Sequence, residues 1–149
     1  MIASRRKDQM TQMLEHLGRL SASDFAALAM RASVYSKLKW DVMVGSRSER
    51  IGQMMLKPGI GLGGMAIRHG IPYRANRLEN PAMLTECPVM LAEKLVSGVA
   101  IPLALVTAGG MGGVLLLGRR EGMPYANEEM GMIESFIPHF VEIMNAEAL

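Results

Sequence analysis

The spacing of apolar residues follows a helical period at both ends of this chain and a strand period between them. Near the N-terminus, Met10, Leu14 and Leu17 recur at three- and four-residue intervals. The segment 127–146 has the same spacing, and Pro138 within it predicts a kink. Between these ends lie short apolar runs without strict strand–helix–strand alternation. This order predicts an α+β domain with helices packed on a mainly antiparallel sheet.

The first half of the chain is predicted to contain two helices, a hairpin and a glycine-rich loop. Gly18 is a plausible end for the first helix, and Ser21 with Asp24 resembles a capping box that opens a second. That second helix would carry one apolar face: Phe25, Leu28, Ala29 and Ala32. The hairpin would pair 37–44 with 50–56, and one face of its first strand would hold Leu38, Trp40, Val42 and Val44. The segment 57–64 is too rich in glycine for regular structure, so only 65–68 is expected to be helical.

The second half is predicted to supply further strands and helices. Segment 71–74 suits an edge strand, and Pro88 suits the first turn of a helix that ends near Leu95. Segment 99–106 is apolar on both faces, as expected for a central strand. Glycines at 109–113 predict a turn before another buried strand at 114–117.

Composition limits the classes of function. The chain has 149 residues, half of them hydrophobic, which is enough for one domain with its own core. Its formal net charge of +2 gives no support for nucleic-acid binding. Cys87 is the single cysteine, which excludes an internal disulfide and any Cys/His zinc spacing. With no secretory signal pattern and no apolar run long enough to span a bilayer, we expect a cytoplasmic protein away from the membrane.

Three segments in order resemble the signature of GAF domains. They are Pro58 to Ala66 followed by Gly70-Ile71-Pro72, then Val99 to Leu103, and then Gly112 to Leu117. The resemblance covers roughly residues 20–148. It implies a GAF/PAS-like antiparallel sheet of five to six strands flanked by helices, with the N- and C-terminal helices packed together. It also implies one domain over 1–149, with an N-terminal helix at 1–20 and the GAF core at 21–149.

Within that superfamily, the short chain is similar to the NreA family of stand-alone nitrate receptors. The resemblance implies a cytoplasmic sensor that binds nitrate through backbone amides and acts on a partner sensor histidine kinase in two-component signalling. It implies no catalysis, no metal and no cofactor. The expected ligand-binding residues combine amides and cavity walls: Trp40, Leu62, Met65, Ala66, Val99, Ile101 and Pro102. Met65, Ala66 and Ile101 would offer amides, whereas Trp40, Leu62 and Val99 would form walls.

The physical basis is that the first amides of a helix lack intrahelical partners and carry partial positive charge. A glycine loop before them allows a ligand to approach the backbone closely. Nitrate would then need no basic side chain, and we expect Arg68 and Arg74 to be solvent-exposed, with steering of an anion as their alternative role.

Other functions stay open. Some GAF domains reduce free methionine-R-sulfoxide with a thiol nucleophile and a resolving cysteine, and here only Cys87 is present. The domain could instead bind another small molecule. It could also act only as an interaction module, with the apolar stripe of the last helix forming a homodimer.

Overall fold

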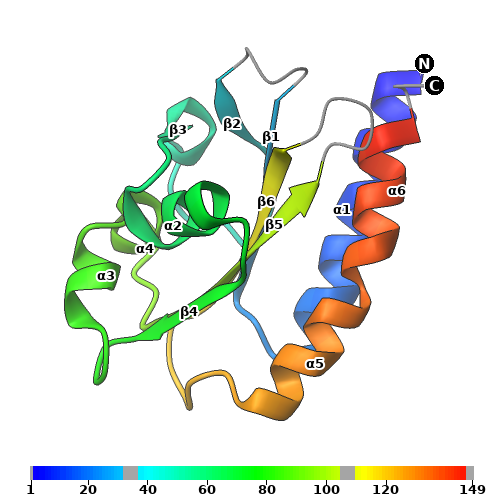
Figure 1. The fold of residues 1–149 in the computed structure, drawn as a ribbon. Helices are drawn as coiled ribbons and strands as arrows, with labels where there is room; N and C mark the ends of the chain where they lie inside the picture. The colour runs from blue at the N-terminus through cyan, green and yellow to red at the C-terminus, as the bar shows by residue number, and fades with distance from the viewer. Residues whose placement is uncertain (1, 32–36, 105–109, 147–149) are drawn as a thin grey trace.

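The computed structural model describes residues 2–31, 37–104 and 110–146. Figure 1 shows helices on both sides of one curved sheet. The helices are α1 (Ile2–Leu20), α2 (Gly61–His69), α3 (Pro81–Thr85), α4 (Pro88–Ala92), α5 (Asn127–Ser135) and α6 (Ile137–Asn145), with a 3₁₀ turn η1 (Ile51–Gln53). The strands are β1 (Phe25–Met30), β2 (Leu38–Val44), β3 (Met55–Leu56), β4 (Tyr73–Asn76), β5 (Ser97–Ala104) and β6 (Met111–Arg119).

The sheet has six strands in the order β3-β2-β1-β6-β5-β4, and every neighbouring pair is antiparallel. The predicted α+β class and the predicted number of strands are therefore confirmed. The long central strands β1, β5 and β6 are buried along nearly their whole length. Their sequences are apolar at successive positions because both faces of the sheet are covered.

Each face of the sheet has its own hydrophobic core. One core lies under α2, α3 and α4 and contains Trp40, Leu62 and Leu116. The other lies under α1, α5 and α6 and contains Leu14, Val99 and Phe140. Helices α1 and α6 lie side by side, with the start of α1 next to the end of α6 (Figure 1). This confirms the packing of the terminal helices implied by the resemblance.

The C-terminal segment divides where the sequence predicts a kink. Helix α5 ends at Ser135 and α6 begins at Ile137, so that Pro138 occupies the first turn of α6. Proline is tolerated there because the first helical N–H groups have no intrahelical partner in any case. Phe140 and Met144 then face the core and are buried.

The prediction of a second helix after Gly18 is wrong. Helix α1 continues to Leu20, and Ser21 donates its hydroxyl to the Leu17 carbonyl rather than capping a new helix. Phe25 to Met30 form β1 at the centre of the sheet. Periodicity could not separate the two possibilities because the segment is apolar at every position, and Phe25 and Ala26 belong to opposite cores. Ala32 lies outside the described residues, as do Leu105 and Val106 of the predicted 99–106 strand.

The predicted common face of the first hairpin strand is also wrong. The β1–β2 register pairs Leu28 with Val42 and Ala29 with Trp40, so Asp41 is an extra residue in β2. Such a β-bulge reverses the alternation of side chains. Leu38 and Trp40 therefore lie in the core under α2, while Val42 lies in the core under α1. The bulge is what directs Trp40 toward the helix that follows the glycine-rich segment.

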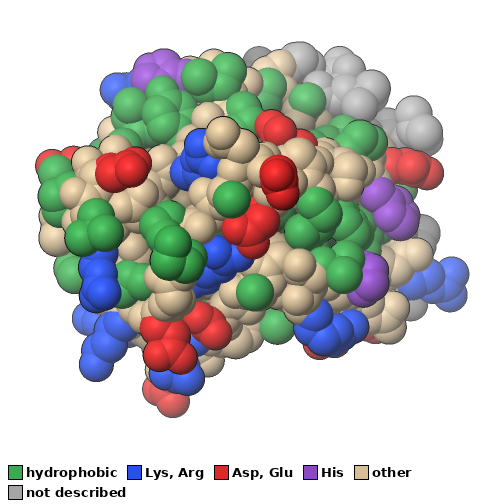
Figure 2. Space-filling model, turned by 90° about the horizontal axis from the view of Figure 1, so that it is seen from below, with side chains coloured by type: hydrophobic (Ala, Val, Ile, Leu, Met, Phe, Trp, Pro, Cys, Tyr) green, Lys and Arg blue, Asp and Glu red, His purple; other side chains and the backbone are tan. Residues whose placement is uncertain are grey.

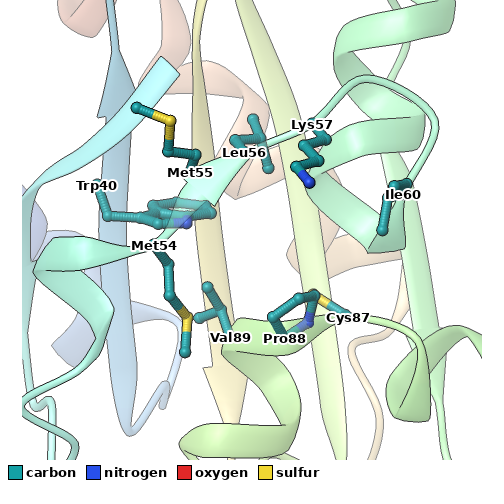
Figure 3. Close-up of a pocket in the computed structure, with 9 residues that line it drawn as sticks. All are labelled: Trp40, Met54, Met55, Leu56, Lys57, Ile60, Cys87, Pro88 and Val89. Atoms are coloured by element: carbon teal, nitrogen blue, oxygen red, sulfur yellow. The ribbon is translucent and has the colours of Figure 1, made fainter. Parts of the chain in front are cut away.

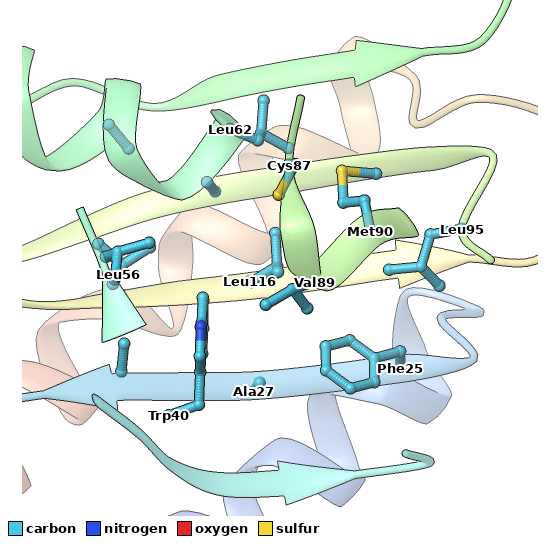
Figure 4. Packing of buried hydrophobic residues seen from close by; sticks show 14 of the residues in the cluster. Phe25, Ala27, Trp40, Leu56, Leu62, Cys87, Val89, Met90, Leu95 and Leu116 are labelled. Carbon is cyan, nitrogen blue, oxygen red and sulfur yellow. The ribbon is translucent and has the colours of Figure 1, made fainter. Parts of the chain in front are cut away.

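The strand predicted at 50–56 is short. Ile51–Gln53 form the 3₁₀ turn, and only Met55 and Leu56 pair with β2. The helix predicted at 65–68 is longer, since α2 begins at Gly61 and ends at His69, followed by Gly70 as the C-cap with a left-handed φ of 68°. Figure 4 shows Leu62 of this helix and Leu56 of β3 in the core that also contains Trp40.

Candidate ligand pocket

A mostly apolar pocket of about 310 Å³ lies between β2, β3 and α4 (Figure 3). It is lined by Trp40, Met54, Met55, Leu56, Lys57, Ile60, Cys87, Pro88 and Val89. Lys57 is the only charged residue of this lining. Its volume falls at the lower end of the range of small-molecule sites, about 300–1,000 Å³. The pocket is therefore large enough for a small organic ligand.

The start of α2 lies at one wall of this pocket. Ile60, which precedes the helix, lines the pocket, and so does Cys87, which contacts Gly61. A Cβ atom on Gly61 would lie 2.9 Å from the Cα of Cys87, and Gly61 has a φ of 74°. A Cβ on Gly63 would lie 2.9 Å from Leu56 and 3.8 Å from the Trp40 ring. These glycines bring the helix backbone close to the pocket walls.

The position of the helix start changes which amides are available. Because Ile60 is the N-cap, the N–H groups of Gly61, Leu62 and Gly63 have no partner within the helix. Met65 and Ala66 lie in the second turn, where their N–H groups belong to the helical ladder. Met65 and Ala66 therefore lie one turn beyond the helix start at which their amides are expected, and their role in binding stays a prediction. Leu62, expected as a wall, lies in the first turn of the helix.

The three expected residues of β5 do not share one environment. Val99 and Ile101 have their side chains in the core under α1, on the face opposite Trp40. Pro102 alternates with them and is half-buried on the side of α2. The structure thus separates the Val99 side chain from Trp40. The amide of Ile101 lies one residue beyond the last β4 pairing, which joins Tyr73 to Ala100.

The glycine-rich segment before α2 is tied by its own backbone. Gly59 donates to the Gly64 carbonyl at 2.7 Å, and Ile60 donates to the Lys57 carbonyl at 3.1 Å. Arg68 is exposed, as expected, and its guanidinium lies over Gly59 and donates to the Pro58 carbonyl at 3.3 Å. Arg68 therefore holds this loop.

Arg74 lies away from the pocket. It donates to the Tyr125 carbonyl at 3.0 Å and to the side chain of Asn127 at 2.5 Å. These bonds join the edge strand β4 to the segment that opens α5.

Helix α4, which carries Pro88 and Val89, is anchored by a buried carboxylate. Glu93, only 1% exposed, accepts from the Ser46 hydroxyl at 2.6 Å, the Arg47 amide at 2.8 Å and the Arg120 guanidinium at 2.6 Å. Burial by itself raises the pKa of Glu93, but these hydrogen bonds and one from the Ser48 amide outweigh it, and the net pKa is lowered. The anchor fixes the pocket wall that α4 provides.

Several pocket residues carry no signal that sequence reasoning could use. Met54, Ile60 and Val89 are apolar residues in segments without clear periodicity. Cys87 stood out as the single cysteine, but its position beside α2 depends on a contact between segments 26 residues apart in the chain.

Among the described residues, no group of three or more His, Cys, Asp and Glu side chains could hold a metal ion. In the same part of the chain, no helix combines the length and the apolar character needed to cross a membrane. Figure 2 shows acidic and basic side chains intermixed on the underside of the molecule, in keeping with the small net charge.

Comparison with known proteins places the chain by its structure. No family model and no curated protein sequence matches it. Many solved structures do match. One is a mutated NreA protein from Staphylococcus aureus, altered in its nitrate-binding site. It is 27% identical, with a TM-score of 0.70 over 87% of this chain and 96% of that one.

Two further matches share the fold at lower identity. The GAF domain of a phosphoenolpyruvate-protein phosphotransferase from Acinetobacter is 12% identical, with a TM-score of 0.74 over 93% of this chain and 81% of that one. A type II free methionine-R-sulfoxide reductase from Thermoplasma acidophilum is 16% identical, with a TM-score of 0.77 over 98% and 96%. The six-stranded sheet, its helices and these likenesses agree: the chain has the fold of GAF domains and is similar to NreA.

Proposed function

We propose that this GAF domain is a small-ligand sensor, that its ligand is nitrate, and that it binds this ligand without transforming it. The observation that carries the proposal is the start of α2, where the amides of Gly61, Leu62 and Gly63 lack helical partners beside Trp40. The likeness to NreA, whose nitrate-binding site is known, supports the choice of anion.

The physical chemistry of such a site favours a weakly hydrated anion. Nitrate is a planar monoanion that loses less hydration free energy on leaving water than phosphate does. Hydrogen bonds to a charged group contribute about 1.5–3 kcal/mol each. After the cost of association, three of them correspond to a dissociation constant between about micromolar and millimolar. That range suits a sensor of a metabolite.

Nitrate is expected to bind to the protein with measurable heat and to raise its melting temperature. At a concentration one hundred times the dissociation constant, the stabilisation corresponds to about 5 to 10 °C. Calorimetry with nitrate, nitrite and chloride measures affinity and selectivity. In ¹H–¹⁵N spectra the amide signals of Gly61 and Gly63 should move saturably with nitrate.

Gly122 and Gly131 supply the internal control for those spectra, because both lie in exposed positions away from the pocket. Absence of heat and of any thermal shift with millimolar nitrate would reject nitrate as the ligand. Movement of all four glycine signals together would point to a general salt effect instead.

Signalling would follow from a change in population rather than from chemistry. A ligand that binds one arrangement of the 57–64 loop and α2 better than another shifts the equilibrium between them. Helix α2 packs on β5 and β6, and α6 packs on the opposite face of β5. We propose that this route reaches α1 and α6, and that a partner sensor histidine kinase in the cytoplasm reads the change there. A second copy of this chain is the alternative partner for the same helices.

Cys87 supports one competing function, reduction of free methionine-R-sulfoxide, because it lines the pocket beside Trp40. In that reaction the thiol takes the sulfoxide oxygen and becomes a sulfenic acid, while the sulfoxide becomes a thioether. Since this chain has no second cysteine, two external thiols are needed: one condenses with the sulfenic acid, releasing water and forming a mixed disulfide, and a second displaces the Cys87 thiolate from that disulfide.

We expect no such turnover. The measurement mixes the protein, free methionine-R-sulfoxide and a thioredoxin system, and follows NADPH consumption. The matched variant is Cys87→Ser, which changes one atom of a buried side chain. Turnover by the unmodified protein that disappears in Cys87→Ser would replace the sensor proposal with an enzymatic one.

A further inference from the structure

We propose that the apolar pocket lined by Trp40, together with a cationic hollow that adjoins it, binds a carboxylic acid with an apolar tail. The tail would occupy the pocket, and the carboxylate would lie in the hollow. As for nitrate, this binding rests on the proposed role of the domain as a small-ligand sensor, but the organic acid is a second class of ligand and does not require nitrate to bind.

The first observation is that the pocket is much larger than an inorganic anion needs. A volume of about 310 Å³ compares with about 30 Å³ for one water molecule in the liquid. Its inner walls are apolar: Trp40 and Val89 are buried, and Met54 and Leu56 contribute flexible aliphatic chains. An apolar body of several carbon atoms gains free energy by leaving water for such a space.

The second observation is a hollow of about 270 Å³ that shares Met55, Leu56 and Lys57 with the pocket. Arg31 and Lys37 also line it, so that the described residues of its lining include three basic side chains and no acidic one. An anionic group in this hollow would be attracted by all three cations, whereas the pocket beside it offers almost no polar partner.

Arg31 gives this hollow a polar group in need of a partner. Its Nη2 donates to the Met111 carbonyl, but its Nε is buried and has no hydrogen-bond partner among the described residues. Buried polar atoms are normally paired, and an unpaired one costs stability. A carboxylate in the hollow would supply an acceptor for guanidinium donors there.

Lys57 lines both the pocket and the hollow. In Figure 3 its side chain extends over the pocket between Trp40 and Ile60, with the ammonium group toward the cavity. No ion pair to an acidic residue is found for Lys57 among the described residues. The apolar pocket, the Lys57 ammonium group and the cationic hollow together are more complementary to an amphipathic monoanion than to a neutral molecule of the same shape.

The test is calorimetry of the whole chain with butanoate, hexanoate and octanoate, and with hexanol as the uncharged analogue of hexanoate. Burial of each added methylene should tighten binding about fourfold until the pocket is full. Hexanol should bind about fivefold more weakly than hexanoate, the factor expected for a partly exposed charge pair. Fluorescence of Trp40, the single tryptophan, gives an independent readout inside the pocket.

Two kinds of variant locate the two parts of the ligand. Lys57→Met keeps the aliphatic stem and should weaken hexanoate, but not hexanol, by part of that fivefold difference, because Arg31 and Lys37 remain. Lys39→Met removes the same charge from a residue that lines neither space and should leave both affinities unchanged. Val89→Phe narrows the pocket and should weaken hexanoate by about fifteenfold, the contribution of two methylenes. Met54→Phe narrows it from another wall if circular dichroism shows that Val89→Phe is not folded.

Equal affinity for hexanol and hexanoate, or equal effects of Lys57→Met and Lys39→Met, would overturn the inference. Affinity that does not change with chain length would overturn it as well. A nitrate titration of the same sample separates the two proposals: heat with nitrate and none with the alkanoates leaves the nitrate sensor standing and removes the organic acid. Heat with the alkanoates and none with nitrate supports the organic acid as ligand and rejects nitrate.

Discussion

Replacement of Glu93 by glutamine is expected to lower the free energy of unfolding by about 3–5 kcal/mol, the usual cost of removing one partner from a buried ion pair. The Glu93 side chain is fully buried, and its two oxygens accept four hydrogen bonds, two at each oxygen. An amide in its place would direct N–H donors at a site that already supplies donors on both sides, and it would leave Arg120 without a counter-charge. Urea or guanidinium unfolding at neutral pH measures the loss.

The same carboxylate predicts how stability depends on pH. The pKa of Glu93 is lower in the folded protein than its ordinary value of 4.5, so the folded state favours the ionised form. The stabilisation that ionised Glu93 gives the folded protein is fully present at pH values above its pKa in the unfolded chain. It is lost as the pH falls through its pKa in the folded protein. The difference in stability between the natural protein and Glu93→Gln should therefore shrink steadily below about pH 4.

Glu121→Gln is the control, because it makes the same chemical change in a side chain that is exposed at the surface. It should alter stability by no more than about 0.5 kcal/mol at any pH. A Glu93→Gln protein as stable as Glu121→Gln at neutral pH would show that the carboxylate does not anchor α4.

Gly64→Ala is expected to destabilise the protein by about 3 kcal/mol and to abolish ligand binding at the start of α2. A Cβ atom on Gly64 would lie 2.3 Å from the Lys57 carbonyl oxygen, a backbone atom that cannot rotate away. The clash would also displace the bond from the Gly59 amide to the Gly64 carbonyl, which closes the loop before the helix. Thermal unfolding and nitrate calorimetry measure the two effects.

The matched control is Gly131→Ala, which makes the same substitution inside helix α5. Nothing lies within 4 Å of a Cβ placed there. Alanine should therefore stabilise that helix by about 0.5–1 kcal/mol, because glycine loses more chain entropy on folding. Gly64→Ala and Gly131→Ala should change the melting temperature in opposite directions, and a shift of the same sign in both would contradict the close packing at Gly64.

Opposite signs for the same substitution at Gly64 and Gly131 show why sequence patterns do not predict a helix in the glycine-rich segment. Glycine lowers helix propensity, so 57–64 was expected to be irregular throughout. Gly61, Gly63 and Gly64 are nevertheless helical, and glycine is required at these positions because Cys87, Leu56 and Lys57 leave no room for a Cβ atom. These neighbours come from other segments, and local propensity contains no information about them. Placement of the free amides at Met65 and Ala66 followed from that misjudged start.

The sequence by itself determined the α+β class, the terminal helices, the kink before Pro138 and an order of motifs that resembles that of GAF domains. All of these depend on residue types and short spacings, which fix local conformation and the burial of one face or two. It also singled out Trp40 and the glycine-rich segment, which the structure brings together.

Only the tertiary structure decided which residues meet. Between 25 and 30 every position is apolar, so helix and strand were equally consistent with the pattern until pairing with β2 and β6 made it a central strand. One extra residue, Asp41, turned Trp40 and Val42 to opposite faces, and the alternation of β5 placed Val99 away from Trp40. The side of a sheet on which a residue lies depends on register with strands distant in the chain, and that register is set by the packing of the whole domain.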